Sequence, residues 1–417
     1  MEDKARRFAL TVLRRVWEQG AYSNIEIINT LKRTELSTID KAFGVALVNG
    51  AAERLLTLDF MIERASGRKC ADIEKELLAV LRLGFLQLFY MKVPDMAACS
   101  ESVALVSGKK RKGFVNAVMR SACRGRSALE AAVEAAEDSV KYSLSPEICD
   151  LVAAQYPDES DAVMAAFFDH NPLILRVNTL KNTAEKLLEL LTAAGVEGTV
   201  LGKAVAVQSG SSAGLAAVDM GDAFVQGLSS QAAVSALGAQ AGHRVIDMCA
   251  CPGGKTLGAA LDMENTGSIL AMDIHGNKLP LIKRSAETLG VDIIETREQD
   301  GRKYDPTLAE SADRVICDVP CSGIGAIKGR PEIRYKSFSD IDRLIDTQRA
   351  ILKNAYCYLK KGGRMVYSTC TVNKNENEGV VHPFLTESGA VLVSERTVLP
   401  LEKWHDGFYI AVLEKRI

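Results

Sequence analysis

The chain has 417 residues, of which 47% are hydrophobic and 25% are charged, and its formal net charge at pH 7 is −2. This length exceeds that of one typical domain and predicts two or three. The composition is that of an ordinary globular protein, and because no run of about 18 apolar residues occurs, we expect no membrane-spanning helix.

The small net charge hides an uneven distribution. Residues 1–126 carry 22 Lys and Arg against 14 Asp and Glu, a net charge of +8, whereas the remainder carries 29 against 39, a net charge of −10. A basic front part fits a polyanion-binding module joined to a second module, although charges scattered over solvated helices would give the same count.

The first residues lack the layout of a signal peptide, so the ten cysteines indicate a reducing, cytoplasmic setting.

Residues 1–126 have the periodicity of helices throughout. Apolar residues recur at 3–4 spacing over 5–17, 39–58 and 73–90, and the last of these helices should end before Pro94. Two more helices are predicted at 100–107 and 113–123, with a basic loop at 107–113 between them. The front part is therefore predicted to be an all-α bundle.

The period changes after the front part. Residues 127–140 are rich in Ala and Glu and predict a helical connector, and Pro146 suits the first turn of another helix. A strand is predicted at 173–178, then a helix at 184–194 and short strands near 200, 204–207 and 224–225. Residues 145–220 should form a small α+β subdomain.

From residue 229 onward, strands and helices alternate. The predicted strands are 244–248, 268–273, 293–298, 312–318 and 364–368, with helices at 255–260, 278–289 and 341–359. Such alternation predicts a parallel sheet covered by helices on both faces, that is, a Rossmann-like α/β domain. Residues 407–414 are predicted to be a final edge strand.

A glycine turn follows the first of these strands, and it runs Asp247-Met248-Cys249-Ala250-Cys251-Pro252-Gly253-Gly254-Lys255-Thr256. It is not a P-loop, because the position five residues before the second glycine is Cys249 and not glycine. A tight turn between a first strand and its helix is the usual site for an adenosine-bearing cofactor.

Acidic residues follow four successive strands. These residues are Asp247, Asp273, Asp300 and Asp318. In an open α/β sheet they lie at one carboxyl edge, where a carboxylate after the second strand can bind ribose hydroxyls. Any one of them could be a turn former, but four in register favour a ligand site.

Two cysteines sit where predicted strands end. Cys321 follows Pro320 after the fourth strand, and Cys370 follows Thr369 after the fifth. Cys249, Cys251, Cys317 and Cys321 do not make C-x-x-C pairs, and no histidine is in step with them, so we predict no metal. Two thiols beside a nucleotide-type turn favour covalent chemistry on a flat electrophile.

These residues together resemble the Sun family of S-adenosylmethionine-dependent RNA 5-cytosine methyltransferases. The motifs that match are Asp247–Thr256, Asp273, Asp300, Asp318–Gly323 and Ser368–Thr371, with further similarity at 176–181, 224–231 and 330–334. The chain departs from the family pattern at Cys251 and Val319, where alanine is usual. A small side chain at either position should be tolerated.

The front part resembles a NusB-type RNA-binding helical domain. The similarity lies in 43–50, 81–88 and 112–120. The resemblance therefore implies a NusB-like domain at 1–130, a linker with a small α+β subdomain at 131–220, and a Rossmann-like methyltransferase domain at 221–417. The combination implies methylation of carbon 5 of a specific cytosine in small-subunit (16S) ribosomal RNA, through a covalent Cys–cytosine adduct.

The resemblance also implies roles for the site residues. It gives Cys370 as the nucleophile, Cys321 as the residue for product release, and Asp318 and Lys255 as catalytic partners. S-adenosylmethionine would be bound by residues from the turn, the strand ends and Asp318. These binding residues are Cys249, Ala250, Cys251, Pro252, Gly253, Gly254, Lys255, Asp273, Asp300 and Asp318.

Several alternatives remain open from the residues alone. A Pro-Cys nucleophile, as in DNA cytosine methyltransferases, would give the attacking role to Cys321. A non-catalytic RNA-binding factor and a tRNA-directed family member also remain, whereas an amino-group methyltransferase lacks its Asn/Asp-Pro-Pro-aromatic motif here. We expect a monomer acting on 16S ribosomal RNA or an early small-subunit particle, with no membrane contact.

Overall fold

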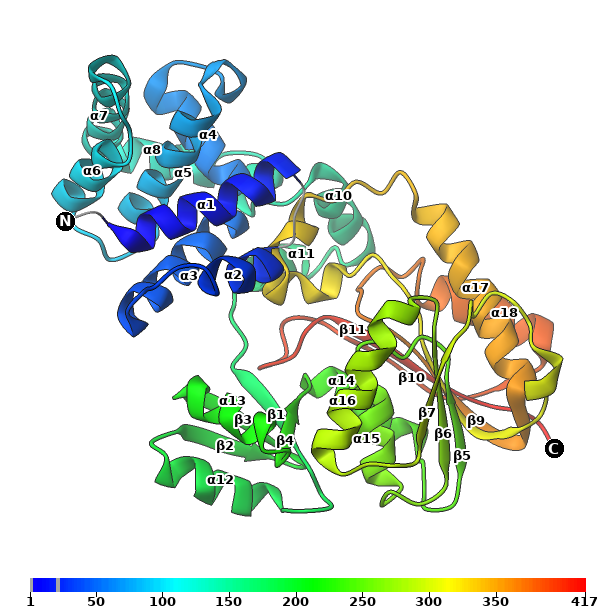
Figure 1. Cartoon of the computed structure of the whole chain (residues 1–417). Helices are drawn as coiled ribbons and strands as arrows, with labels where there is room; N and C mark the ends of the chain where they lie inside the picture. The colour runs from blue at the N-terminus through cyan, green and yellow to red at the C-terminus, as the bar shows by residue number, and fades with distance from the viewer. Residues whose placement is uncertain (1–2, 20–22) are drawn as a thin grey trace. The chain divides into compact units, whose positions relative to one another are not determined.

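The computed structural model describes residues 3–19 and 23–417, and it divides into two compact units (Figure 1). The helical unit comprises residues 1–168 together with the segment 329–337, and the sheet unit comprises residues 169–328 and 338–417. No helix in the described residues combines the length and hydropathy that crossing a membrane requires.

The helical unit is built around one buried helix. Helix α5 (Lys75–Phe89) packs against α1, α3, α4, α6 and α7, and its Leu81 and Phe85 are fully buried. The packing at Gly84 is close, because an added Cβ would lie 2.6 Å from Sδ of Met119 and that side chain would have to shift. The other helices are α1 (Lys4–Gln19), α2 (Ser23–Leu31), α3 (Thr38–Glu53), α4 (Leu55–Ser66), η1 (Cys70–Asp72), α6 (Asp95–Ala104), α7 (Lys109–Arg124), α8 (Arg126–Glu134), α9 (Asp138–Lys141), α10 (Pro146–Gln155) and α11 (Ser160–Ala166).

The single helix predicted over 39–58 is wrong, since the structure has two helices, α3 and α4, that meet at Arg54. The backbone N–H of Leu55 donates to the hydroxyl of Tyr335, 3.0 Å away, and that hydroxyl donates to the carbonyl of Ala52 at 2.7 Å. The residue that hydrogen-bonds the backbone groups at the break between the two helices is thus 280 residues away in sequence. A local pattern of apolar residues cannot reveal such a partner.

The segment 329–337 is an integral part of the helical unit. It contains the short helix η5 (Pro331–Tyr335), and Arg334 is fully buried among the surrounding helices. The guanidinium of Arg334 donates to the carbonyls of Tyr142 and Phe167. These bonds offset part of the cost of burying a charge.

The sheet unit begins with a small antiparallel sheet in the order β2-β3-β1-β4. Its apolar face packs against α12 (Ala184–Ala193) and α13 (Ser211–Asp219). The strands are β1 (Leu173–Val177), β2 (Glu197–Leu201), β3 (Ala204–Ser209) and β4 (Ala223–Val225). A small α+β subdomain is therefore present, but residues 145–168, which were predicted to belong to it, lie in the helical unit.

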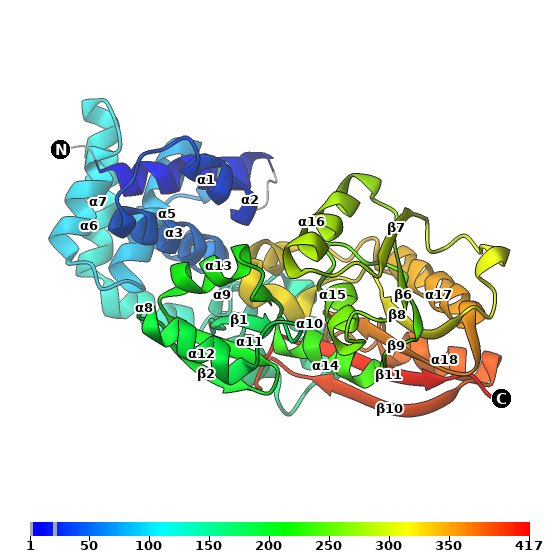
Figure 2. The same cartoon turned by 60° about the horizontal axis from the view of Figure 1, so that its bottom comes forward.

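The main sheet has seven strands in the order β10-β11-β9-β8-β5-β6-β7, and β10 and β7 form its two edges (Figure 2). The five strands from β9 to β7 are parallel, and β11 and β10 add antiparallel. The strands are β5 (Arg244–Asp247), β6 (Ser268–Asp273), β7 (Ile294–Glu298), β8 (Ala312–Asp318), β9 (Leu359–Thr369), β10 (Val391–Val398) and β11 (Phe408–Glu414).

Both faces of this sheet are covered by helices, as predicted (Figure 1). Adjacent residues of a strand point to opposite faces, so Val245 packs with α14, α15 and α16 whereas Ile246 packs with α17 and α18. The helices are α14 (Leu228–Leu237), α15 (Gly254–Asp262), η2 (Gly276–Lys278), α16 (Leu279–Leu289), η3 (Pro306–Leu308), η4 (Ile324–Gly329), α17 (Ile341–Tyr358) and α18 (Glu378–Ser388).

Two other local predictions are wrong. Strand 408–414 is not an edge strand, because β10, which the prediction missed, pairs along its outer side. The basic stretch predicted as a loop begins helix α7 at Lys109. The helical connector predicted over 127–140 is confirmed, and it consists of two short helices, α8 and α9.

Candidate active site

The parallel strands bring the predicted site residues to one edge of the main sheet. Asp247, Asp273 and Asp318 are the last residues of β5, β6 and β8, and Asp300 lies two residues beyond β7. Cys370 directly follows β9. Because β9, β8, β5, β6 and β7 are adjacent and parallel, their carboxyl ends form one continuous edge.

Asp247, the last residue of β5, holds the glycine turn through a hydrogen bond with Thr256. This side chain is 1% exposed, and its Oδ2 accepts a hydrogen bond from Oγ1 of Thr256 at 2.7 Å. Gly253 has φ +112°, a conformation that favours glycine, and it leads directly into α15. Burial raises the pKa of Asp247 to about 7.

The small sheet supports the same turn from another side. Gln226 donates through Nε2 to the carbonyl of Gly254 at 2.8 Å, and its Oε1 accepts from the buried Arg176 at 3.2 Å. Arg176 also donates to the carbonyl of Gly258 and to Asp262 within α15. The Gly254 end of the turn and the helix that follows it are thus held by groups outside the main sheet.

Asp273 joins the glycine turn to β6. Its carboxylate accepts hydrogen bonds from the backbone N–H of Cys251 at 3.0 Å and of His275 at 2.8 Å. Burial acts to raise the pKa of Asp273, but these hydrogen bonds outweigh it and hold the pKa below its ordinary value. The carboxylate therefore stays charged at neutral pH, with lone pairs left to accept further hydrogen bonds.

Asp300 is engaged by its neighbour in the loop after β7. Arg302 donates to both of its carboxylate oxygens, at 2.9 and 2.8 Å, and these bonds lower the pKa of Asp300. Asp300 is held in place by this pairing, with its charge retained.

Lys255 connects helix α15 to the end of β8. From the first turn of α15, its Nζ donates to Oδ2 of Asp318 at 2.7 Å. Oγ of Ser368, near the end of β9, donates to the other oxygen of Asp318 at 2.6 Å. Asp318 is thereby fixed between two neighbouring strands and the glycine turn.

The two predicted thiols lie next to each other. Sγ of Cys321 and Sγ of Cys370 are 3.3 Å apart, at hydrogen-bonding distance, although the residues are 49 positions apart in the chain. The pKa of Cys321 is well above its ordinary value, first because of the hydrogen bond with Cys370 and then because of burial and nearby negative charge. A protonated Cys321 can therefore donate a hydrogen bond to the Cys370 sulfur.

The remaining cysteines of this edge are in different environments. Cys317 is fully buried within β8, and burial raises its pKa well above its ordinary value. Burial raises the pKa of Cys251 to about 12 and that of Cys249 well above its ordinary value. Such thiols are poor nucleophiles at neutral pH.

In residues 3–19 and 23–417, no cluster of three or more His, Cys, Asp or Glu side chains has the arrangement of a metal site.

Sequence reasoning missed a set of buried polar residues beside the thiols. Gln348, Glu376 and Asn377 are fully buried, and Ser322 and Asn373 are nearly so. They lie in hydrogen-bonding contact with one another and with the two cysteine loops. A signal was present, because the polar run 373–378 directly follows a strand-end cysteine, but a sequence pattern does not distinguish such a run from an exposed loop.

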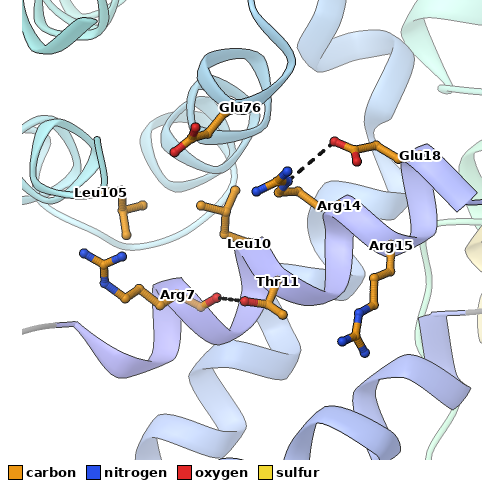
Figure 3. A pocket seen from close by; sticks show the side chains of 8 residues that line it. All are labelled: Arg7, Leu10, Thr11, Arg14, Arg15, Glu18, Glu76 and Leu105. Atoms are coloured by element: carbon orange, nitrogen blue, oxygen red, sulfur yellow. Dashed lines mark hydrogen bonds and ion pairs between the residues drawn. The ribbon is translucent and has the colours of Figure 1, made fainter. Parts of the chain in front are cut away.

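A separate pocket of about 370 Å³ lies in the helical unit (Figure 3). Arg7, Arg14 and Arg15 of α1 line it, and Arg14 pairs with Glu18 at 3.5 Å. Arg15 pairs with Glu26 at 2.8 Å. The pocket is therefore lined by both signs of charge, and none of the strand-end residues contributes to it.

The geometry of the sheet unit defines the class of protein. A mixed seven-stranded sheet with a glycine turn after β5 and an acidic residue at the end of β6 is the Rossmann-like methyltransferase fold, here joined to a NusB-like helical domain. Residues 234–414 match the family described as 16S rRNA methyltransferase RsmB/F. Residues 3–124 match the NusB family, and residues 148–210 match an RsmF/B-like ferredoxin-like domain.

Full-length relatives agree with these matches. A probable ribosomal RNA small subunit methyltransferase B of Bacillus subtilis is 33% identical over 398 residues, covering 93% of this chain and 89% of its own. A ribosomal RNA small subunit methyltransferase B of Yersinia enterocolitica is 30% identical over 429 residues, covering 99% and 98%. The chain belongs to the ribosomal RNA small subunit methyltransferase B family, and it is a ribosomal RNA methyltransferase.

Solved structures show the same fold. The crystal structure of PH0851 superposes with a TM-score of 0.82 at 22% identity, covering 100% of this chain and 99% of that one. A methyltransferase homolog from Pyrococcus horikoshii superposes with a TM-score of 0.61 at 25% identity, covering 67% and 97%.

Proposed function

We propose that this enzyme methylates carbon 5 of a specific cytosine in 16S ribosomal RNA through a covalent Cys–cytosine adduct. The observation that carries the proposal is the pair of thiols, Cys321 and Cys370, 3.3 Å apart at the ends of two adjacent parallel strands. The relatives named for small-subunit ribosomal RNA support the substrate.

The chemistry requires a nucleophile before methyl transfer. Carbon 5 of cytosine is too weakly nucleophilic to accept a methyl group unaided. Addition of the Cys370 thiolate to carbon 6 forms a C–S bond and shifts the ring electrons to carbon 5, which can then attack an electrophilic methyl group. Cys321, held protonated and 3.3 Å away, donates a hydrogen bond that favours the thiolate of Cys370.

Release reverses the addition. The proton on carbon 5 passes to water, and its electron pair restores the double bond between carbons 5 and 6. The electrons of the C–S bond return to the sulfur of Cys370, which leaves while Cys321 donates a hydrogen bond to it. Cys321 therefore assists product release, whereas Cys370 makes the attack.

Asp318 and Lys255 act on the same cytosine ring. Asp318 already accepts from Lys255 and Ser368, yet each of its oxygens keeps a lone pair for the exocyclic amine or a ring N–H. Lys255 holds this carboxylate in place and adds positive charge, which offsets the charge that develops as the adduct forms.

The cofactor we propose is S-adenosylmethionine, which supplies a methyl group on a positively charged sulfur. The residues fit such a group, because Gly253 takes the positive φ of a tight turn after β5 and two charged carboxylates follow on the next strands. We assign binding to Cys249, Ala250, Cys251, Pro252, Gly253, Gly254, Lys255, Asp273, Asp300 and Asp318.

The partner and setting follow from the substrate. A cytosine must be unpaired or flipped out to reach thiols at a strand edge, so we propose an RNA loop in 16S ribosomal RNA or an early small-subunit particle. The basic NusB-like domain at 1–130 would bind that RNA, with a linker subdomain at 131–220 and the catalytic domain at 221–417. We propose a cytoplasmic monomer.

Substitution of the two thiols tests the proposal. Cys370→Ala should abolish methyl transfer from labelled S-adenosylmethionine to 16S ribosomal RNA while leaving cofactor binding, measured by calorimetry, unchanged. Cys321→Ala should accumulate a protein–RNA complex that survives a denaturing gel. Cys357→Ala, which removes another half-buried thiol on α17, is the matched control and should behave like the wild type. Wild-type turnover by Cys370→Ala would contradict the assignment.

A further inference from the structure

A fully buried carboxylate joins the two cysteine loops. Oε2 of Glu376 accepts from the backbone N–H of Ser322 at 2.8 Å and from Nε2 of Gln348 at 3.0 Å. Oε1 accepts from Oγ of Ser322 at 2.5 Å and from Nδ2 of Asn373 at 3.0 Å. One side chain therefore receives four hydrogen bonds from three residues.

These contacts bear most directly on Cys321. Glu376 binds both the N–H and the hydroxyl of Ser322, the residue that follows Cys321, and Gln348 also donates to the carbonyl of Pro320 at 2.9 Å. The two neighbours of Cys321 in the chain are thus fixed through one network.

Cys370 depends less on this carboxylate. Glu376 accepts directly from Asn373, three positions after Cys370, and it reaches Thr371, the next residue after Cys370, through the hydroxyl of Ser322, which lies 2.8 Å from Oγ1 of Thr371. The carbonyl of Cys370 accepts instead from the N–H of Gly325 at 3.0 Å, and Asn377 donates to the carbonyl of Thr371 at 3.1 Å. Loss of the Glu376 charge should therefore disturb Cys321 more than Cys370.

Three of the four groups that face Glu376 are N–H donors and the fourth is the hydroxyl of Ser322, so a side chain with an acceptor oxygen on both branches suits the site. An amide in its place would direct its NH₂ group either at the backbone N–H of Ser322 or at the side-chain amide of Asn373. The amide of Asn373 cannot simply turn over, because its Oδ1 accepts from the N–H of Asn375 at 3.1 Å. Either orientation leaves a buried donor without a partner.

We infer that Glu376 is a positioning residue that holds the thiol of Cys321 against the sulfur of Cys370 for product release. The inference rests on the proposed division of labour between the thiols. The negative charge of Glu376 supports the same role, because it contributes to raising the pKa of Cys321 and so to keeping this thiol protonated. A protonated, correctly placed Cys321 is what the departing sulfur of Cys370 needs.

Glu376→Gln in the full-length protein tests the inference, with Glu378→Gln as the matched control. Glu378 is a nearby, partly buried carboxylate that bonds to Thr397 and not to either cysteine loop. With a 16S ribosomal RNA fragment and S-adenosylmethionine, Glu376→Gln should accumulate the covalent complex and slow product release about 100-fold. Its affinity for S-adenosylmethionine should stay within about twofold of the wild type, because Glu376 lies outside the proposed cofactor residues.

Two results would overturn the inference. One is release at the wild-type rate. The other is parallel loss of adduct formation, cofactor affinity and thermal stability, which would indicate a packing role only. If Glu376→Gln does not fold, Ser322→Ala keeps the backbone N–H bond to Glu376 and removes the two hydroxyl bonds, one to Glu376 and one with Thr371. Ser322→Ala should accumulate the covalent protein–RNA complex to a smaller degree than Glu376→Gln. Product release by Ser322→Ala at the wild-type rate would also contradict the inference.

Alkylation of the thiols without RNA separates this inference from the proposed function. Mass spectrometry of peptides gives the rate at which iodoacetamide modifies Cys321 at each pH. The pH at which this rate rises should be lower in Glu376→Gln than in the wild type, and it should be unchanged in Glu378→Gln. That shift shows that Glu376 acts on Cys321 even if Cys321→Ala fails to trap an adduct, a failure that would contradict the release role of Cys321. An unchanged profile contradicts the inference even if Cys321→Ala traps it.

Discussion

Replacing Asp247 with asparagine should remove a pH dependence from the stability of the sheet unit. Asp247 is 1% exposed beneath the glycine turn, and burial raises its pKa from 3.8 to about 7. The hydrogen bond from Thr256 and the nearby Lys255 act against this rise, and the charge of Asp318 adds to it. The folded protein therefore keeps a proton on Asp247 at pH values where the unfolded chain has lost it.

The sign and size of the effect follow from this difference. Below about pH 3.8 both states are protonated and the stabilisation is fully present; it is lost as the pH rises toward 7, and above that it is constant. About 3 pKa units at about 1.36 kcal/mol each amount to about 4 kcal/mol in total. Between pH 5 and pH 8, the wild type should lose about 3 kcal/mol relative to Asp247→Asn.

Urea unfolding at several pH values measures this difference. The chain has two tryptophans, so in a Trp17→Phe background the fluorescence of Trp404 reports on the sheet unit alone. Asp273→Asn is the control, because the lowered pKa of Asp273 places its titration below pH 5. Parallel stability curves for the wild type and Asp247→Asn would refute the reasoning, as would a difference that keeps growing above pH 8.

Two further substitutions test the site geometry. An added Cβ at Gly325 would lie 1.9 Å from the carbonyl oxygen of Gly407, so Gly325→Ala should destabilise the sheet unit by about 1–3 kcal/mol in urea unfolding. Gly329→Ala, with nothing within 4 Å of its Cβ, should change little, and equal effects would contradict this packing. Asp273→Ala removes the acceptor for the N–H of Cys251 and should weaken S-adenosylmethionine binding roughly tenfold or more by calorimetry; unchanged affinity would show that Asp273 does not position the turn.

Residues at strand ends were predictable from the sequence. Apolar runs that stop at Asp247, Asp273 and Asp318 mark buried parallel strands, and parallel strands must share one carboxyl edge. The same reasoning placed Cys321 and Cys370 after the fourth and fifth predicted strands. Their separation of 3.3 Å depends on the loops that follow the strands, which periodicity does not describe.

Features that depend on distant partners were not predictable. The break between α3 and α4 is satisfied by Tyr335, and Glu376 is buried only because Ser322 and Gln348 bring donors to it. In the sequence, Glu376 is one polar residue in a polar run. Strand β10 was missed for a related reason, because most of its residues, including Glu395, are exposed or half-exposed and it lacks the apolar run of a central strand.

Bisulfite sequencing of 16S ribosomal RNA tests the central claim most directly. The RNA would come from a strain lacking this gene, complemented with the wild-type chain or with Cys370→Ala. One cytosine should resist deamination with the wild-type chain and be deaminated both in the deletion strain and with Cys370→Ala. The same pattern of protected cytosines in all three strains would contradict the account.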